Sequence, residues 1–229
     1  MARWNGQSTE IRLTQTFDQM ADSYDRWYET DEGRAILMAE WSCLRRVGGS
    51  LSGRWLEVGV GTGRFASVLG VYDGVDPSLA MLGIAARRGI RTCAARAEDL
   101  PLRSASLDGV LLALTLCFVV DPRCALTECR RVLRTKGRLL LGVVPADSAW
   151  GREYARKASA GHSVYSAAHF RPAAETLGLV ESSGFTLLRA ASSLFWGPGE
   201  SPQTDPMVEA GISPGAGFVC LLFERLVEG

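Results

Sequence analysis

The chain has 229 residues, of which 25 are basic and 25 acidic, so its formal net charge is zero. This balance argues against a broad electrostatic attraction to nucleic acid or to an anionic membrane. Only Lys136 and Lys157 are lysines, and His162 and His169 are the two histidines. With 47% hydrophobic and 22% charged residues, the composition is that of a globular protein, and it disfavours lysine, phosphate-loop and metal chemistry.

The N-terminus has no apolar segment of the kind found in signal peptides. The longest apolar run, residues 110–120, is interrupted by Thr115 and is too short to span a bilayer. The six cysteines form no CxxC motif, and neither histidine lies near a cysteine pair, so we expect no metal site. These features predict a cytoplasmic protein with reduced thiols.

An amphipathic helix is predicted over residues 15–29, because apolar side chains recur there at steps of three or four. A second helix is predicted over residues 33–47 and ends at Gly48 and Gly49. Strands and helices then alternate along the chain. The predicted strands cover residues 54–58, 71–76, 91–95, 108–114 and 137–144. The predicted helices between them cover residues 62–69, 78–88 and 122–133. This alternation predicts a parallel sheet with helices on both faces.

The C-terminal third has a different pattern. Residues 150–157 and 172–183 are predicted to be helical, and residues 185–194 and 217–226 are predicted strands. Proline and glycine are frequent between these two strands, which predicts a surface loop there.

Three glycines on alternate positions, Gly59, Gly61 and Gly63, follow the first predicted strand and precede a helix. Glycine lets the backbone turn sharply and lets a ligand approach without a Cβ in the way, while a helix N-terminus presents free N–H groups. Arg64 stands where a dinucleotide fingerprint, G-x-G-x-x-G, has its last glycine. The pattern therefore predicts a ligand-binding turn, with a plain tight turn as the alternative.

Polar residues follow the next strands at the same edge of the predicted sheet. Asp76 ends the second strand, where a carboxylate can accept hydrogen bonds from both hydroxyls of a ribose. The alternative is a turn or helix-capping aspartate in Asp-Pro-Ser. Ala97, Glu98 and Asp99 follow the third strand. Because ligands of open α/β sheets bind at the carboxyl ends of the strands, this order predicts a site at that edge.

Taken together, five stretches resemble the class I S-adenosylmethionine-dependent methyltransferases of the small-molecule type, similar to methyltransferase type 11. They are LEVGVGTGRF (56–65), VDPSLAML (75–82), AEDLPL (97–102), SLDGVLLALTLCFVVDP (106–122) and LRTKGRLLLGVVP (133–145). The N-terminal FDQMADSYDRWYE also resembles the helix with which that family begins. The resemblance implies an α/β, Rossmann-like sheet of seven strands in the order 3-2-1-4-5-7-6, with strand 7 antiparallel, helices on both faces and a small helical lid.

The resemblance also implies one domain over residues 1–229. Its parts are a helical lid (1–50), a cofactor-binding core (51–145), an acceptor-side insertion and helix (146–184) and a C-terminal strand pair (185–229).

In this resemblance the three glycines let the methionine and ribose parts of the cofactor lie on the backbone, and Asp76 binds the ribose hydroxyls. The other implied cofactor contacts are Glu57 behind the glycine turn, Pro77, Ala97 and Glu98 around the adenine, Leu114 and Thr115 beside the methionyl part, and Tyr24 over the pocket. Arg96 departs from the family, because many relatives carry an aspartate there for the adenine amino group. Adenine reading is then expected from Glu98 or Asp99.

The resemblance places the acceptor under a lid made of the N-terminal helix and the segment after the fifth strand. We predict acceptor contacts from Tyr28, Trp150, Tyr154 and Tyr165, with plain packing as the alternative. His162 is the candidate general base, because imidazole titrates near neutral pH, and a surface or capping role is the alternative.

Cys117 is predicted to be a small buried hydrophobic residue, or alternatively a nucleophile. A sulfonium methyl group is already activated, so its transfer needs proximity and a dry, aligned site more than a strong base.

The predicted function is methyl transfer from S-adenosylmethionine to a small-molecule acceptor by direct in-line displacement. We expect a monomer or homodimer that binds neither nucleic acid nor membrane. Two alternatives stay open. A nucleotide-cofactor oxidoreductase is the first, and Arg64 argues against it. A non-catalytic S-adenosylmethionine-binding partner subunit is the second, because no obvious base is present.

Overall fold

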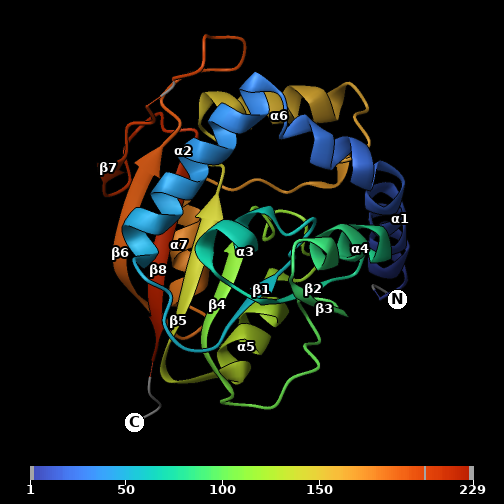
Figure 1. The fold of residues 1–229 in the computed structure, drawn as a ribbon, viewed down its shortest axis with the longest axis vertical. Helices are drawn as coiled ribbons and strands as arrows, with labels where there is room; N and C mark the ends of the chain where they lie inside the picture. Colours follow the sequence, from blue (N-terminus) through green and yellow to red (C-terminus); the bar gives the residue numbers. More distant parts are fainter. Residues whose placement is uncertain (1–2, 204, 227–229) are drawn as a thin grey trace.

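The computed structural model describes residues 3–203 and 205–226, and side chains from residue 11 onward. At its centre is an eight-stranded sheet with the order β3-β2-β1-β4-β5-β8-β6-β7 (Figure 1). The strands are β1 (Trp55–Val58), β2 (Asp73–Asp76), β3 (Arg91–Ala94), β4 (Leu107–Ala113), β5 (Leu133–Val143), β6 (Phe185–Ser193), β7 (Glu209–Ala210) and β8 (Phe218–Arg225).

The helices are α1 (Arg3–Trp27), α2 (Asp31–Gly48), α3 (Arg64–Leu69), α4 (Leu79–Arg87), α5 (Pro122–Val132), α6 (Ala149–Ser159), the 3-10 helix η1 (Tyr165–Ala167) and α7 (Ala173–Glu181). Side-chain caps explain where several of them begin. Thr30, Ser78, Asp121 and Ser148 each accept a hydrogen bond from the N–H three residues later, which satisfies a donor that the first helical turn leaves free.

The predicted strand order and the antiparallel last strand are confirmed. The neighbouring strands β3, β2, β1, β4 and β5 pair with one another in parallel. Strand β8 is antiparallel to both β5 and β6. The sheet has one strand more than the seven expected, because β7 pairs with the edge strand β6. Strand β7 has two residues and lies in a segment rich in proline and glycine, so the sequence shows no alternation of apolar and polar residues that would predict it.

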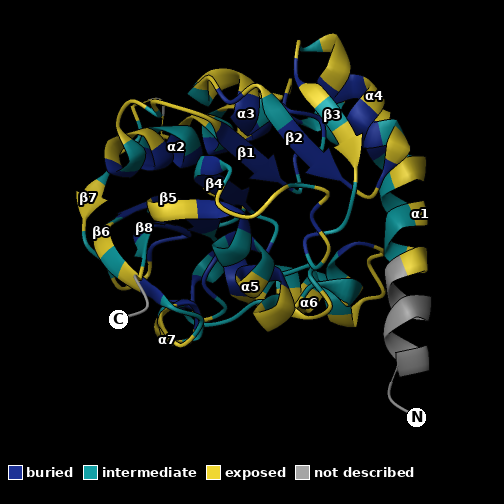
Figure 2. Ribbon diagram, turned by 90° about the horizontal axis from the view of Figure 1, so that it is seen from below, coloured by how far each residue is buried: buried dark blue, intermediate teal, exposed yellow. Residues whose placement is uncertain are grey.

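Both faces of the sheet are covered. In β4, Val110 and Leu112 belong to the core layer under α5 and α7, whereas Leu111 and Ala113 belong to the layer under α2, α3 and α4. Side chains of successive strand residues point to opposite faces, so a strand buried on both sides becomes continuously apolar. Figure 2 shows the central strands as the buried layer between the helices.

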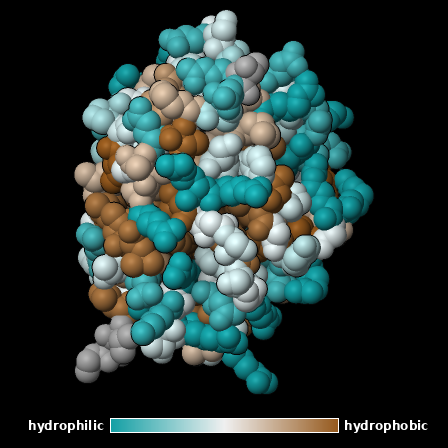
Figure 3. All heavy atoms as spheres, turned by 60° about the vertical axis from the view of Figure 1, so that its left-hand side comes forward, coloured by the Kyte–Doolittle hydropathy of each residue, from teal (hydrophilic) through white to brown (hydrophobic). Residues whose placement is uncertain are grey.

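Helix α1 packs along α4 outside these two layers, through Ala21 on one helix and Met81 and Ile84 on the other. On the face shown in Figure 3, hydrophobic residues lie in patches that hydrophilic side chains separate, as is usual for a folded protein surface. Among the described helices, none has the length and apolar content needed to cross a bilayer.

Candidate functional site

A cavity of about 460 Å³ lies at the carboxyl edge of the sheet. The segments that follow β1, β2, β3, β4 and β5 form one side of it, and residues of α1, α2, α6 and η1 form the other. Of the site residues predicted from sequence, only Glu57, Gly63 and Asp99, the alternative adenine reader, do not line it. The structure therefore brings the predicted cofactor and acceptor residues together around one space.

The glycine turn after β1 gives this cavity a backbone wall. Gly59 and Gly61 have φ angles of 74° and 51°, in a region of backbone conformation that residues other than glycine rarely adopt. A Cβ on Gly59 would lie 2.3 Å from Cγ2 of Thr115, whereas a Cβ on Gly61 would meet nothing within 4 Å. Gly61 thus leaves open space beside the cavity. Gly63 lies outside it and instead faces Ala85 and Ile90, where its lack of a side chain lets α3 pack against α4.

Asp76 ends β2 next to this turn, and its carboxylate is held by the backbone. Its Oδ2 accepts a hydrogen bond from Gly61 N–H, and its Oδ1 accepts one from Ser78 N–H, both at 2.9 Å. Burial raises the pKa of Asp76, and these two hydrogen bonds oppose that rise. Each carboxylate oxygen has a second lone pair, so the group can still accept bonds from a ligand's hydroxyls.

Glu57 lies in β1 beneath the turn and is 1% exposed. Its Oε2 has no hydrogen-bond partner within the described part of the chain. Burial raises the pKa of Glu57 well above the usual range. The position agrees with a carboxyl group that supports the turn or acts through water, and the predicted contribution to cofactor binding stays a prediction.

The segment after β3 forms the next part of the wall. Ala97, Glu98 and Arg96 line the cavity, whereas Asp99 is exposed and does not. Oε1 of Glu98 accepts a hydrogen bond from Asp121 N–H at 3.2 Å and lies 3.6 Å from the Arg96 guanidinium. Glu98 is therefore the better placed of the two predicted adenine readers, and Arg96 balances its charge.

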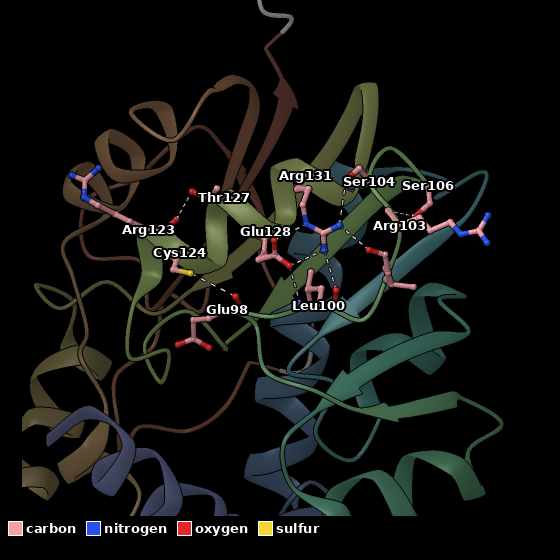
Figure 4. Close-up of polar contacts among 11 residues, drawn as sticks. Glu98, Leu100, Arg103, Ser104, Ser106, Arg123, Cys124, Thr127, Glu128 and Arg131 are labelled. Carbon is pink, nitrogen blue, oxygen red and sulfur yellow. Dashed lines mark hydrogen bonds and ion pairs between the residues drawn. The ribbon is translucent and has the colours of Figure 1, made fainter. Parts of the chain in front are cut away.

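Side chains of α5 hold this segment in place (Figure 4). Leu100 N–H donates to Oε2 of Glu128 at 2.9 Å, and Arg131 donates to the carbonyl oxygens of Leu100 and Leu102 at 3.0 and 2.8 Å. Glu128 and Arg131 also form an ion pair at 2.6 Å. The loop that carries Ala97 and Glu98 is thus held in one conformation by hydrogen bonds to helix α5.

At the end of β4, Leu114 has a φ angle of 58°. Positive φ in a non-glycine residue is strained, and such strain clusters at functional sites. The next residue, Thr115, donates from Oγ1 to the Ala113 carbonyl at 3.1 Å. Cys117 follows in the same wall, and burial raises its pKa to about 12. Cys117 is therefore a neutral thiol, which favours the packing role over the nucleophile.

Arg64 connects the N-terminal helix to the rest of the protein. From the sequence it was noted only as the residue in place of the last glycine of a dinucleotide fingerprint. Its Nε donates to Oδ1 of Asp25 on α1 at 2.9 Å, and its guanidinium lies over the Tyr28 ring at 5.3 Å. Arg88 donates to Oδ2 of Asp25 at 2.7 Å. Burial raises the pKa of Asp25, but the hydrogen bonds from Arg88 and Arg64 outweigh it and lower the pKa to about 2. The N-terminal helix is thus tied to α3 and α4.

The four predicted acceptor residues meet at the end of the cavity under this lid. The hydroxyls of Tyr24 and Tyr28 are 3.1 Å apart, and the Tyr154 and Tyr165 rings stack at 4.4 Å. The indole N–H of Trp150 donates to a backbone carbonyl, that of Trp196, at 2.7 Å. This end of the cavity is therefore aromatic and built from α1, α6 and η1.

His162 lies in the cavity wall but is exposed. Its ring is 4.6 Å from that of Tyr165, and its Nδ1 accepts from Val164 N–H at 3.3 Å. An exposed position at the rim suits a general base at the reacting atoms less than a buried one would. A catalytic role for His162 stays a prediction.

Sequence reasoning missed one functional candidate, Glu40 on α2. It lines the aromatic end of the cavity and is 3% exposed. Burial raises its pKa to about 8, with Cys43 adding to the rise. The signal was a carboxylate within the apolar stripe of α2, which includes Ile36, Cys43 and Leu44. A charged residue on the buried face of an amphipathic helix is rare unless it has a partner.

Comparison with known proteins identifies the family. A family model described as a methyltransferase domain matches residues 56–141. An uncharacterized protein of Mycobacterium tuberculosis is 40% identical over 88% of this chain and 70% of its own length. An uncharacterized protein of Methanocaldococcus jannaschii is 35% identical over 92% of this chain and 98% of its own length.

Among solved structures, a SAM-dependent methyltransferase of Thermotoga maritima, described as a possible histamine N-methyltransferase, superposes with a TM-score of 0.84. It is 33% identical and covers 93% of this chain and 99% of its own. The chain therefore belongs to the class I S-adenosylmethionine-dependent methyltransferases, enzymes that use S-adenosylmethionine as their cofactor.

Proposed function

We propose that this enzyme transfers the methyl group of S-adenosylmethionine to a small-molecule acceptor held at the aromatic end of the cavity, by direct in-line displacement. The observation that supports this most is the continuity of one cavity between the glycine turn with Asp76 and the cluster of tyrosines under the lid. When bound, the cofactor supplies a methyl group that its positive sulfonium has already activated. The protein's task is then to position the two partners and exclude water.

The residues at the sheet edge fit this cofactor. The open side of Gly61 accommodates a ligand close to the backbone, and Asp76 offers two oriented carboxylate oxygens for a ribose. We assign the adenine to the wall formed by Ala97 and Glu98, and the methionyl part to the wall formed by Leu114 and Thr115. A buried Glu57 oxygen with no partner among the described residues adds a further polar group beneath the turn.

The lid end fits an acceptor of small size. Tyr28 and Trp150 are buried, and further aromatic and aliphatic side chains line the walls beside them. Enclosed, mostly apolar cavities with a few polar groups are typical of small-molecule sites. The two cationic residues among the described cavity walls, Arg96 and Lys157, pair with Glu98 and Glu153. This arrangement does not favour a polyanion such as nucleic acid.

The remaining expectations belong to the same proposal. The described cysteines are all unpaired, as in proteins of a reducing compartment, and we propose a cytoplasmic location. Action as a monomer or homodimer, and as a single domain over residues 1–229, are likewise proposed.

Two measurements test the proposed function. Calorimetry should show binding of S-adenosylhomocysteine and no binding of NAD. Incubation with a methyl-labelled cofactor and a small-molecule extract should then move the label into small molecules that chromatography resolves. Binding of NAD in place of S-adenosylhomocysteine would contradict the proposed function and favour the alternative of a nucleotide-cofactor oxidoreductase. Label found only in macromolecules would contradict the small-molecule acceptor.

A further inference from the structure

A carboxyl group without a partner lies at the acceptor end of the cavity. Glu40 is 3% exposed and lines the cavity from α2. Its Oε2 has no hydrogen-bond partner among residues 11–203 and 205–226, and none of the ion pairs in that part of the chain includes it. A buried carboxyl group is costly unless something pairs with it. Because Glu40 faces a cavity, the missing partner is best supplied by a ligand.

Aromatic rings from the other walls surround this group. They include four tyrosines of α1, α6 and η1 that line the same cavity as Glu40, which are Tyr24, Tyr28, Tyr154 and Tyr165. Burial raises the pKa values of all four, and the charge of Glu40 adds to the rise. Faces of tyrosine rings attract cations, and they do so more strongly in a site that excludes water. Carboxylate and rings together favour a positively charged ligand group.

The other charged groups near this end are paired or exposed. Lys157 pairs with Glu153, its side chain is 39% exposed, and its ammonium lies 5.8 Å from the ring centres of Tyr154 and Tyr165. Glu32 and His162 also line the cavity and are exposed. On its own helix, Glu40 has Cys43 as an ionisable neighbour, and that thiol raises the pKa of Glu40 further. An anionic acceptor would therefore gain no counter-charge from Glu40, whether that carboxyl group is protonated or ionised.

We propose that the acceptor is an amine whose nitrogen binds to the Glu40 carboxylate inside these aromatic walls, and that Glu40 accepts the proton of the ammonium form. This inference rests on the proposed function, because it names the acceptor class of the same site. In the proton transfer, an N–H bond breaks and an O–H bond forms on Glu40. The electron pair stays on nitrogen, and a neutral amine is the form able to accept a methyl group.

Binding to the S-adenosylhomocysteine complex tests this with three probes of one shape. They are 2-phenylethylamine, the neutral 2-phenylethanol and the anionic phenylacetate. The amine should bind at least about tenfold more tightly than either of the others, as a charge-assisted contact in a desolvated site predicts. At pH 7 Glu40 is mostly protonated before the amine binds. Calorimetry in buffers of different ionisation enthalpy should therefore show release of close to one proton per amine.

The variant Glu40→Gln keeps the shape and removes the charge. It should lose at least about tenfold in amine affinity while its affinity for 2-phenylethanol stays the same. The matched control is Asp31→Asn, which removes an exposed carboxylate from the first residue of the same helix and should keep the preference for the amine. Thermal unfolding of both variants checks that they are folded.

The outcomes are distinguishable. If wild type binds the amine and the alcohol equally well, or if Glu40→Gln keeps the preference for the amine, the inference is overturned and the proposed function stands. A preference for 2-phenylethanol would instead make Glu40 a hydrogen-bond partner of a neutral acceptor, which also overturns it. Failure to bind S-adenosylhomocysteine at the outset would overturn the proposed function and this inference together.

Discussion

The two ends of the cavity are built in different ways. The end proposed for the cofactor, called the cofactor end, consists of backbone and short turns that follow strands, with Gly61, Asp76, Ala97 and Leu114 at or just after the ends of four neighbouring strands. The end proposed for the acceptor, called the acceptor end, consists of side chains from α1 and α2 and from α6 and η1, two helix pairs far apart in the chain. A sheet edge imposes the first arrangement wherever the strands form. The second depends on how separate helices pack over that edge.

This difference has a consequence for stability. Asp76 accepts two backbone hydrogen bonds that offset part of the cost of its burial, although burial still raises its pKa. Glu40 has an oxygen with no such bond from the described residues, and Glu57 beneath the glycine turn has another. Of the two buried carboxyl groups that line the cavity, Glu40 is therefore the less compensated one, and its burial costs the folded protein stability until a ligand binds.

The largest expected effect concerns Glu40 and pH. Its pKa is raised from 4.5 to about 8 in the folded protein, so between these values the folded state binds more protons than the unfolded state. Its contribution to the free energy of unfolding therefore falls as pH rises from 4.5 to 8, by on the order of 5 kcal/mol. Glu40→Gln removes this loss.

Chemical denaturation at several pH values measures this effect. At pH 5 the variant and wild type should be equally stable, and at pH 8.5 the variant should be the more stable of the two. Asp31→Asn, the exposed control on the same helix, should follow wild type throughout. A variant less stable than wild type at pH 8.5 would show that Glu40 has a partner in the folded protein, and the contrast between the two ends would disappear.

Asp76→Ala tests the cofactor end. We expect a loss of about 1–2 kcal/mol of cofactor binding, because a charge-assisted pair of hydrogen bonds to the ribose is removed. Asp73→Ala is the matched control, since Asp73 begins the same strand and pairs with Arg91 on the surface. Calorimetry with S-adenosylhomocysteine should show unchanged affinity in the control. Unchanged affinity in Asp76→Ala as well would rule out the ribose assignment.

The same difference explains what could be predicted from sequence. The cofactor end could be predicted because Gly59, Gly61, Asp76 and Glu98 follow predicted strands in chain order, and the edge of a parallel sheet brings such positions together. Glu40 could not be predicted as a site residue, because it lies within an apolar helical stripe and meets the tyrosines only after α1, α6 and η1 have packed. Strand β7 was missed for a simpler reason, since a two-residue pairing has no periodicity.

Gly61→Ala separates backbone strain from ligand contact. Gly61 and Gly70 both have positive φ, and a Cβ would meet nothing within 4 Å at either position. Each alanine should therefore cost about 1 kcal/mol of folding stability from backbone strain alone. Only Gly61→Ala should also weaken binding of S-adenosylhomocysteine, because only Gly61 lines the cavity. Equal cofactor affinity in the two variants would show that the turn does not contact the cofactor.

The smallest expected effect is that of His162→Ala. His162 is exposed at the rim, and its Nδ1 already accepts a hydrogen bond from Val164, whereas Glu40 is buried among the tyrosines. If Glu40 is the proton acceptor, turnover should fall less than about threefold in His162→Ala, as for a surface substitution away from the reacting atoms. Steady-state rates measured with the acceptor that the labelling experiment identifies decide the matter. A loss of more than about a hundredfold, with cofactor affinity unchanged, is the size expected when a general base is removed. That result would transfer the proton-accepting role from the buried carboxyl group to the imidazole.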